Sequence, residues 1–199
     1  MNRKKVTIYC ASSPSIASTF FEAAETLATL LAQQGVEIVY GAGRQGLMGC
    51  IADNIMLHGG KAIGVIPEFM VERDWCHKGL SQLIVTPDMH SRKETMAQMG
   101  EAAIALPGGC GTLEELLEII TWKQLGLYTH PIIILNTSGY YDPLLQMLQQ
   151  AIDNKFMQEK HSSLWYTAST PQEVMEALDK IDEWDTAIGK FTADNMTEQ

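Results

Sequence analysis

Residues 107–115, PGGCGTLEE, combine three glycines with two neighbouring carboxylates. The glycines leave backbone N–H groups uncovered, and an apolar helical pattern begins at once. Because a helix N-terminus attracts anions through its unpaired N–H groups and its dipole, this stretch predicts a phosphate site that needs no basic side chain. Glu114 and Glu115 point to different sides of that helix, so at most one of them readily faces the pocket. A carboxylate beside a phosphate is costly through repulsion, which favours a role on a developing cation.

Helix capping is the alternative interpretation of the same residues. Thr112 and Glu115 form the pattern T-x-x-E, in which the glutamate only reaches back to a backbone N–H at the helix start. On spacing alone, this capping box is favoured over catalysis. The same spacing recurs without obvious chemistry at Ser91 with Glu94 and at Thr170 with Glu173.

A second glycine loop, Gly41–Gly46, matches the pattern G-x-G-x-x-G between an expected strand and an expected helix. It could form a dinucleotide site, a bare structural turn, or another phosphate or nucleotide contact, which we favour. The dinucleotide fingerprint normally occupies the first strand-to-helix turn, whereas a complete strand and helix precede this loop. The next strand ends at Val65-Ile66-Pro67 without the acidic residue that would hold a ribose.

The composition argues against several other classes of protein. The chain has 199 residues, 46% apolar and 19% charged, and its 14 basic and 24 acidic residues give a formal net charge of -10. This acidic surplus argues against nucleic acid and anionic lipid as partners, although a small anion can still bind at local helix ends. Four cysteines without a CxxC pair predict reduced thiols in the cytoplasm. The five histidines show no metal-ligand spacing, so we expect no metal site.

Alternating strand and helix patterns must position the two glycine loops. Short, continuous apolar runs predict strands, and apolar residues at helical spacing predict helices. We expect strands at residues 5–10, 36–40, 61–67, 83–87, 102–107 and 130–136, and a last edge strand at 165–168. We expect helices at residues 15–34, 47–57, 91–100, 112–126, 142–154 and 170–184, and an irregular loop at 68–79.

This alternation predicts an α/β fold, Rossmann-like and doubly wound, with a mainly parallel sheet and helices on both faces. We expect a single nucleotide-binding domain over residues 1–199, of which 185–199 form a frayed acidic tail. Ligands of such sheets bind at the carboxyl ends of the strands, near the topological switch point. That rule selects the loops after Tyr40 and after Leu106, and both are rich in glycine.

Three ordered motifs give the chain a resemblance to a known family. PGGCGTLEE at 107–115 fits PGGxGTxxE, YGAGRQGLMG at 40–49 resembles YGGGxxGLMG, and DMHSRK at 88–93 resembles DMHxRK. These are signatures of the Lonely Guy (LOG) family of cytokinin-activating phosphoribohydrolases, and the likeness covers most of the chain. The sequence departs from the family at Ala11 and Ala42, where glycine is usual, and at Asp74, where glutamate is usual.

The resemblance implies hydrolysis of the N-glycosidic bond of an adenine-type nucleoside 5′-monophosphate to free base and ribose 5-phosphate. It assigns catalysis to Glu115, which would stabilise positive charge at C1′, and to Arg92, which would hold the phosphate, the ribose hydroxyls or the carboxylate. The alternative for Arg92 and Lys93 is solvated charge at a helix start. The expected substrate-binding residues are Ser12, Gly43, Asp74, Lys93, Gly108, Gly109, Cys110, Gly111, Thr112, Leu113, Glu114 and Thr121.

The resemblance implies no cofactor. Members of the family are often labelled lysine decarboxylases, but no sequence context here marks Lys61, Lys93 or Lys123 as a Schiff-base lysine for pyridoxal phosphate. A nucleotide sensor or carrier without hydrolysis remains an alternative, and an NAD-dependent oxidoreductase is a less favoured one. We expect a homodimer, from the resemblance and from the apolar helix at 113–127, with a nucleotide substrate and no nucleic-acid or membrane partner.

Overall fold

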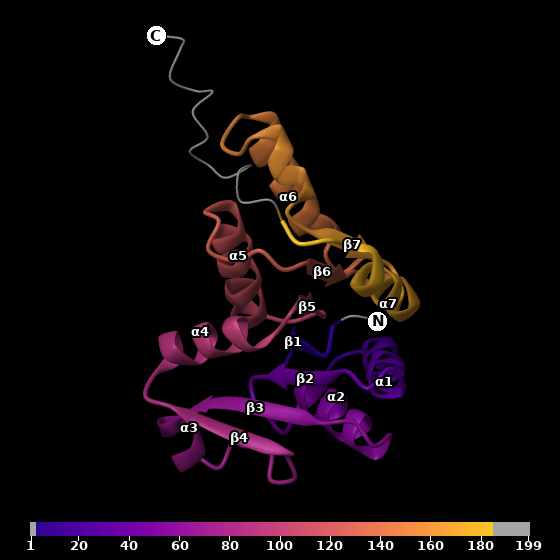
Figure 1. Ribbon diagram of the computed structural model, residues 1–199, viewed down its shortest axis with the longest axis vertical. Helices are drawn as coiled ribbons and strands as arrows, with labels where there is room; N and C mark the ends of the chain where they lie inside the picture. The colour runs from indigo at the N-terminus through magenta and orange to yellow at the C-terminus, as the bar shows by residue number, and fades with distance from the viewer. Residues whose placement is uncertain (1–2, 185–199) are drawn as a thin grey trace.

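The computed structural model describes residues 3–184, which form one seven-stranded sheet with every strand parallel to its neighbours (Figure 1). Apart from Glu37 at the start of one strand, four of the inner strands, Glu37–Tyr40, Ala62–Pro67, Ala103–Ala105 and Ile132–Leu135, are buried throughout, as continuous apolar runs covered on both faces should be. The tail expected at residues 185–199 lies outside the described residues. Across the sheet, the strands are β4 (Gln82–Thr86), β3 (Ala62–Pro67), β2 (Glu37–Tyr40), β1 (Lys5–Tyr9), β5 (Ala103–Ala105), β6 (Ile132–Leu135) and β7 (Tyr166–Ala168).

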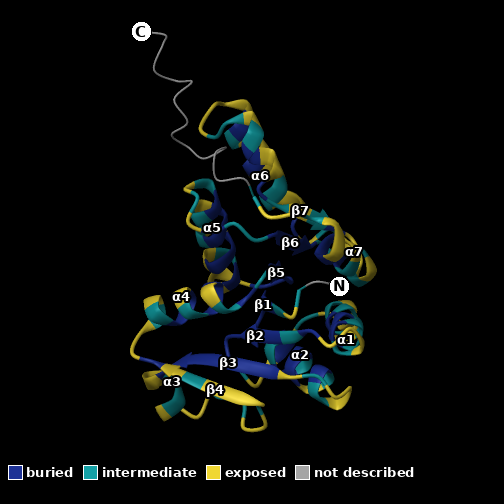
Figure 2. Cartoon of the chain, viewed as in Figure 1, coloured by how far each residue is buried: buried dark blue, intermediate teal, exposed yellow. Residues whose placement is uncertain are grey.

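Two layers of helices enclose the sheet and turn their buried sides toward it (Figure 2). One face is covered by α1 (Ser18–Gln33), α2 (Gly46–Leu57) and α7 (Pro171–Lys180). The other face is covered by α4 (Met89–Met99), α5 (Cys110–Gln124) and α6 (Asp142–Asp153). The short elements are α3 (Glu68–Glu72), η1 (Thr137–Gly139) and η2 (Glu159–Ser163). Between residues 3 and 184, no helix has the length and apolarity that a membrane crossing requires.

The central strand β1 marks the topological switch point. Ile8 of β1 pairs with Tyr40 of β2 on one side and with Ile104 of β5 on the other. The chain runs outward from β1 to β4, and then returns through α4 to β5 on the opposite side of β1. The loops after β1, β2 and β5 therefore open at one edge of the sheet, which is where ligands bind in this class of fold. The expected α/β, doubly wound architecture is confirmed.

The start of α5 differs from the sequence-based expectation. The helix begins at Cys110, with Gly109 as its N-cap and no capping hydrogen bond from a side chain. Thr112 lies inside the first turn, so the interpretation of Thr112 and Glu115 as a capping box is wrong. Gly109 has an extended backbone and ends the loop, so the helix begins two residues earlier than its apolar pattern indicates.

Several other expected boundaries also need correction, and one of them is the end of α7, which lies at Lys180 rather than at residue 184. The α4 helix begins at Met89 because the Asp88 side chain accepts a hydrogen bond from the Ser91 N–H at 2.8 Å, which replaces the expected cap at Ser91. Residues 68–79, expected to be irregular, contain the single turn α3. At α7, the expected cap is confirmed, since Thr170 accepts a hydrogen bond from the Glu173 N–H.

Gly49 in α2 allows the glycine loop to pass close to the helix. A Cβ atom on Gly49 would lie 2.3 Å from the backbone oxygen of Arg44, which cannot rotate away. We therefore expect Gly49→Ala to lower the free energy of unfolding by about 1–3 kcal/mol. Helix propensity alone predicts the opposite sign, a gain of about 1 kcal/mol. Urea unfolding of the parent and of Gly49→Ala decides between these two predictions. A variant more stable than the parent would contradict the close contact between Gly49 and Arg44.

Candidate active site

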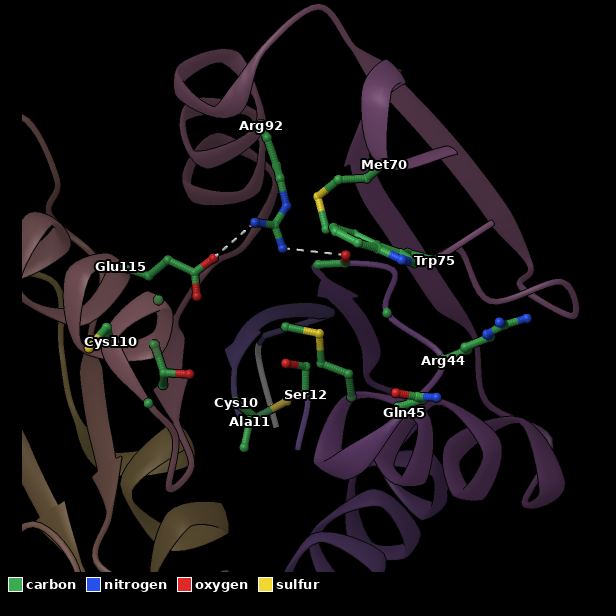
Figure 3. Close-up of a pocket in the computed structure, with 16 residues that line it drawn as sticks. Cys10, Ala11, Ser12, Arg44, Gln45, Met70, Trp75, Arg92, Cys110 and Glu115 are labelled. Carbon is green, nitrogen blue, oxygen red and sulfur yellow. Dashed lines mark hydrogen bonds and ion pairs between the residues drawn. The ribbon is translucent and has the colours of Figure 1, made fainter. Parts of the chain in front are cut away.

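A pocket of about 600 Å³ opens where the loops after β1, β2 and β5 meet (Figure 3). The loop after β2 leads into α2, and the loop after β5 leads into α5, so two helix N-termini border the same space. The segment after β3 forms the wall opposite α5 (Figure 3). The lining residues are Cys10, Ala11, Ser12, Gly41, Gly43, Arg44, Gln45, Met48, Met70, Trp75, Arg92, Gly109, Cys110, Gly111, Thr112 and Glu115.

Arg92 is buried and is held in three directions. Its Nε donates to the Val65 carbonyl at 3.1 Å, and its Nη2 donates to the Gly41 carbonyl at 3.3 Å. Its Nη1 lies 3.4 Å from Glu115 Oε1. Both carbonyls belong to the carboxyl edge of the sheet, so the guanidinium is fixed relative to the strands. The interpretation of Arg92 as solvated charge is wrong, because only 4% of the residue is exposed.

Glu115 presents a buried carboxyl group to the pocket. One oxygen faces Arg92, and the other points into the pocket (Figure 3). Burial raises the pKa of Glu115 to about 7, and the positive charge of Arg92 opposes part of this increase. A carboxyl group that changes charge near neutral pH inside a pocket is typical of a catalytic site.

Lys93 links α4 to α5 from outside the pocket. Its Nζ donates to Glu114 at 2.8 Å and to Glu118 at 3.1 Å, and these contacts tie α4 to α5. The Lys93 side chain is only 7% exposed, so the interpretation as solvated charge is wrong here too. The ammonium and the Glu114 carboxylate, both expected to contact substrate, instead contact each other. This arrangement fixes the distance between the helices that carry Arg92 and Glu115.

Two tyrosines after β6 hold the loop between β5 and α5. The Tyr141 hydroxyl donates to the Leu106 carbonyl at 2.7 Å, and the Tyr140 hydroxyl donates to the Gly108 carbonyl at 2.6 Å. Tyr141 is fully buried, and its ring packs edge-on against that of Tyr140 at 5.1 Å between centroids. The loop is therefore fixed before any ligand binds, which reduces the ordering cost of binding.

The structure brings part of the expected site together. Arg92, Glu115 and six of the expected substrate contacts line the pocket; the six are Ser12, Gly43, Gly109, Cys110, Gly111 and Thr112. The other six are not among the lining residues; they are Asp74, Lys93, Gly108, Leu113, Glu114 and Thr121. Of these, Asp74 is bonded to Arg44 at the rim, and the Thr121 hydroxyl donates to the Leu117 carbonyl one turn back in α5.

Several lining residues were not expected from the sequence. Met70 and Trp75 come from residues 68–79, where no periodic pattern indicated a direction for any side chain. Arg44 and Gln45 stand at the variable positions of the glycine loop. Ala42 in this loop has a φ of +58°, a left-handed conformation that favours glycine. That backbone requirement accounts for the glycine usual at this position in the family.

Among residues 3–184, those that line the pocket include no lysine that could form a Schiff base, so pyridoxal phosphate does not fit this site. Burial lowers the pKa of Lys123 to about 8, but its Nζ donates to the His130 carbonyl at 2.8 Å, outside this pocket. Among residues 3–184, no group of three or more potential ligands could hold a metal ion.

The two cysteines of the pocket differ in burial. Burial raises the pKa of the Cys10 thiol, which opposes formation of a thiolate nucleophile there. Cys110 is exposed at the first turn of α5, and both are free thiols. Glu115 therefore remains the better candidate for the chemistry.

The parallel sheet, its switch-point pocket and the glycine loops at two helix starts define a Rossmann-like α/β protein. A family model described as "Possible lysine decarboxylase" matches residues 48–178. The chain is 35% identical to cytokinin riboside 5'-monophosphate phosphoribohydrolase LOG2 of Arabidopsis thaliana, over 98% of this chain and 92% of that protein. It is 40% identical to the probable cytokinin riboside 5'-monophosphate phosphoribohydrolase LOGL3 of Oryza sativa subsp. japonica, over 89% of this chain and 84% of that protein. The chain belongs to the Lonely Guy family of cytokinin riboside 5'-monophosphate phosphoribohydrolases.

Solved structures support the fold. TM1055 aligns with a TM-score of 0.70 at 23% identity, over 89% of this chain and 99% of that chain. A molybdenum cofactor binding protein from Rippkaea orientalis aligns with a TM-score of 0.68 at 20% identity, over 90% of this chain and 97% of that chain. At this level of identity, both establish a shared architecture alone.

Proposed function

We propose that this protein hydrolyses the N-glycosidic bond of adenine-type nucleoside 5′-monophosphates, either a cytokinin riboside 5′-monophosphate or AMP, to free base and ribose 5-phosphate. The buried couple of Arg92 and Glu115, 3.4 Å apart in the switch-point pocket, carries this proposal. The names of the Arabidopsis and rice relatives support it, since both are called phosphoribohydrolases.

Glu115 acts on the charge that develops at ribose C1′. As the C1′–N bond breaks, the sugar acquires oxocarbenium character, and an ionised carboxylate in a desolvated site stabilises it. The oxygen of a water molecule bonds to C1′, one of its protons passes to the departing base, and the other stays on the new hydroxyl. Arg92 keeps the carboxylate oriented through its contacts with Val65 and Gly41. A guanidinium gives up its protons only with great difficulty, so Arg92 is a poor proton donor.

The phosphate binds at the N-terminus of α5, where Gly109, Cys110, Gly111 and Thr112 line the pocket. Unpaired N–H groups and the helix dipole favour an anion at this end. A carrier that only bound the nucleotide could use the same cradle. It would gain nothing from a buried carboxylate beside a bound phosphate, and this favours the enzyme.

Release of free base tests the proposed activity. The purified protein is incubated with AMP and, separately, with isopentenyladenosine 5′-monophosphate, and the products are separated by chromatography. We expect free base from at least one nucleotide, and the ratio of the two rates gives the substrate preference. No base from either nucleotide would contradict the proposal.

The pKa of Glu115 predicts how activity depends on pH. Glu115 is the neutral acid below about 7 and the carboxylate above it. Since catalysis requires the carboxylate, kcat/KM for AMP should rise about tenfold per pH unit below 7 and level off above it. The substrate phosphate also titrates near pH 6. The Kd of Glu115→Gln for AMP, measured over the same pH range, isolates the effect of phosphate ionisation. A kcat/KM that does not change with pH would contradict the role of the Glu115 carboxylate.

We also propose that the protein is a cytoplasmic homodimer that associates through one side of α5 and the turn after it. Leu117 lies in α5, Leu125 is its C-cap and Leu127 lies in the turn that follows; all three are exposed, Leu127 by 72%. An exposed apolar patch is typical of an interface. Light scattering should give twice the chain mass of 22.0 kDa, whereas a mass of one chain would contradict the dimer.

A further inference from the structure

We propose that Trp75 is the platform on which the base of the nucleotide stacks, and that Asp74 is a positioning residue for it. This inference rests on the proposed function, because it assigns one part of that ligand to one wall of the same pocket. Trp75 and Met70 form the wall opposite α5 (Figure 3). A phosphate bound at α5 with its C1′ beside Glu115 directs the base away from α5, toward this wall.

The indole of Trp75 lines the pocket and also contacts a neighbouring cation. Trp75 is 46% exposed, unusual for so large an apolar ring, and it lines the cavity. The Arg73 guanidinium lies 5.2 Å from the Trp75 ring centre and 5.5 Å from that of Phe69, so it bridges the two rings. This cation–π contact helps to restrain the orientation of the Trp75 ring. Every nucleobase presents a π face that can stack on an aromatic side chain of this kind.

The segment that carries Trp75 is anchored to the glycine loop at successive residues. Cys76 forms a β-bridge with Gly43, and the His77 N–H donates to the Ala42 carbonyl at 2.8 Å. The glycine loop after β2 thus lines the pocket and also holds the segment that carries Trp75. A ring held in place before binding loses little conformational entropy when a base stacks on it.

Asp74 contributes to this anchoring from outside the pocket. Its φ is +56°, a left-handed conformation that aspartate adopts more readily than most residues. Its carboxylate lies 3.1 Å from Arg44 Nη1 and 3.1 Å from Lys78 Nζ, and these contacts lower its pKa. Since Asp74 is not among the lining residues, its effect on the ligand passes through the position of Trp75.

Binding to two ligands that differ only in the base tests the assignment. All variants carry Glu115→Gln, so that AMP is not consumed, and calorimetry measures the Kd for AMP and for ribose 5-phosphate. We expect Trp75→Leu to weaken AMP binding about tenfold or more. Ribose 5-phosphate has no base to stack, so its Kd should stay within about twofold. Trp75→Phe keeps a π face and should recover most of the AMP affinity, and Asp74→Ala should weaken AMP alone.

Phe156→Ala is the matched control, because Phe156 is 85% exposed and lies outside the pocket. It should leave both dissociation constants unchanged. Unaltered AMP affinity in Trp75→Leu, or equal loss for both ligands, would overturn the stacking role. Base release by the parent protein is measured separately. If AMP binding depends on Trp75 but the parent releases no base, the hydrolase proposal fails and the stacking platform stands.

Discussion

Replacing Glu115 with glutamine is expected to lower kcat for nucleotide cleavage by about 10²- to 10⁴-fold. The amide keeps the size of the carboxyl group but cannot carry the negative charge that opposes the positive charge at C1′. The residue is 6% exposed and its pKa is raised to about 7 by burial, so the change affects a desolvated group rather than a surface charge. Base release measured by chromatography gives the rate.

The same variant should still bind AMP, because the proposed phosphate cradle consists of backbone N–H groups at the start of α5. Its fold should also persist, since the amide fits the same space. Calorimetry with AMP and thermal unfolding serve as the two controls. Parent-like turnover by a folded, AMP-binding Glu115→Gln protein would refute the assigned role.

Arg92→Lys is expected to lower kcat by about 10²-fold, although it preserves the charge. One ammonium cannot contact Glu115, Val65 and Gly41 in the directions that the guanidinium fork reaches. The carboxylate would then keep a nearby cation but lose its fixed orientation. Because phosphate binding is assigned to α5, the KM for AMP should change much less than kcat. Steady-state kinetics separates the two constants, and an increase in KM alone would indicate that Arg92 holds the substrate phosphate instead.

Gly41→Ala provides an independent way to move the guanidinium without replacing it. A Cβ on Gly41 would lie 1.8 Å from Arg92 Nη2, so the guanidinium must shift. We expect the same pattern as for Arg92→Lys, a loss in kcat of about 10²-fold with smaller change in KM. If Gly41→Ala retained the parent kcat, the orientation of Arg92 would have no part in catalysis.

The sequence predicts the sheet well because buried parallel strands are continuous apolar runs. Strands expected at 36–40 and 61–67 differ from β2 and β3 by a single residue at their starts. The glycine loops also follow from local backbone requirements, since their residue types reveal turns and helix starts. The proposed catalytic roles of Arg92 and Glu115 come from the family resemblance, because spacing alone favours a capping box for Glu115.

The features that the sequence could not supply depend on burial and on contacts between distant segments. Nothing local distinguishes Lys93, which is buried between carboxylates, from a solvated lysine at a helix start. The pKa of Glu115 follows from its depth beneath the surface, which only the packed structure defines. Trp75 lies in a segment without periodicity, and its direction is set by contacts with the glycine loop.

The products formed from AMP show which bond of the nucleotide the protein cleaves and whether Glu115 is needed. Parent protein and Glu115→Gln are incubated side by side with AMP, and adenine, ribose 5-phosphate, adenosine and inorganic phosphate are quantified. We expect adenine and ribose 5-phosphate in equal amounts from the parent, with both nearly abolished in the variant. Adenosine with inorganic phosphate, or equal adenine release by the two proteins, would contradict cleavage of the N-glycosidic bond by the Arg92–Glu115 couple.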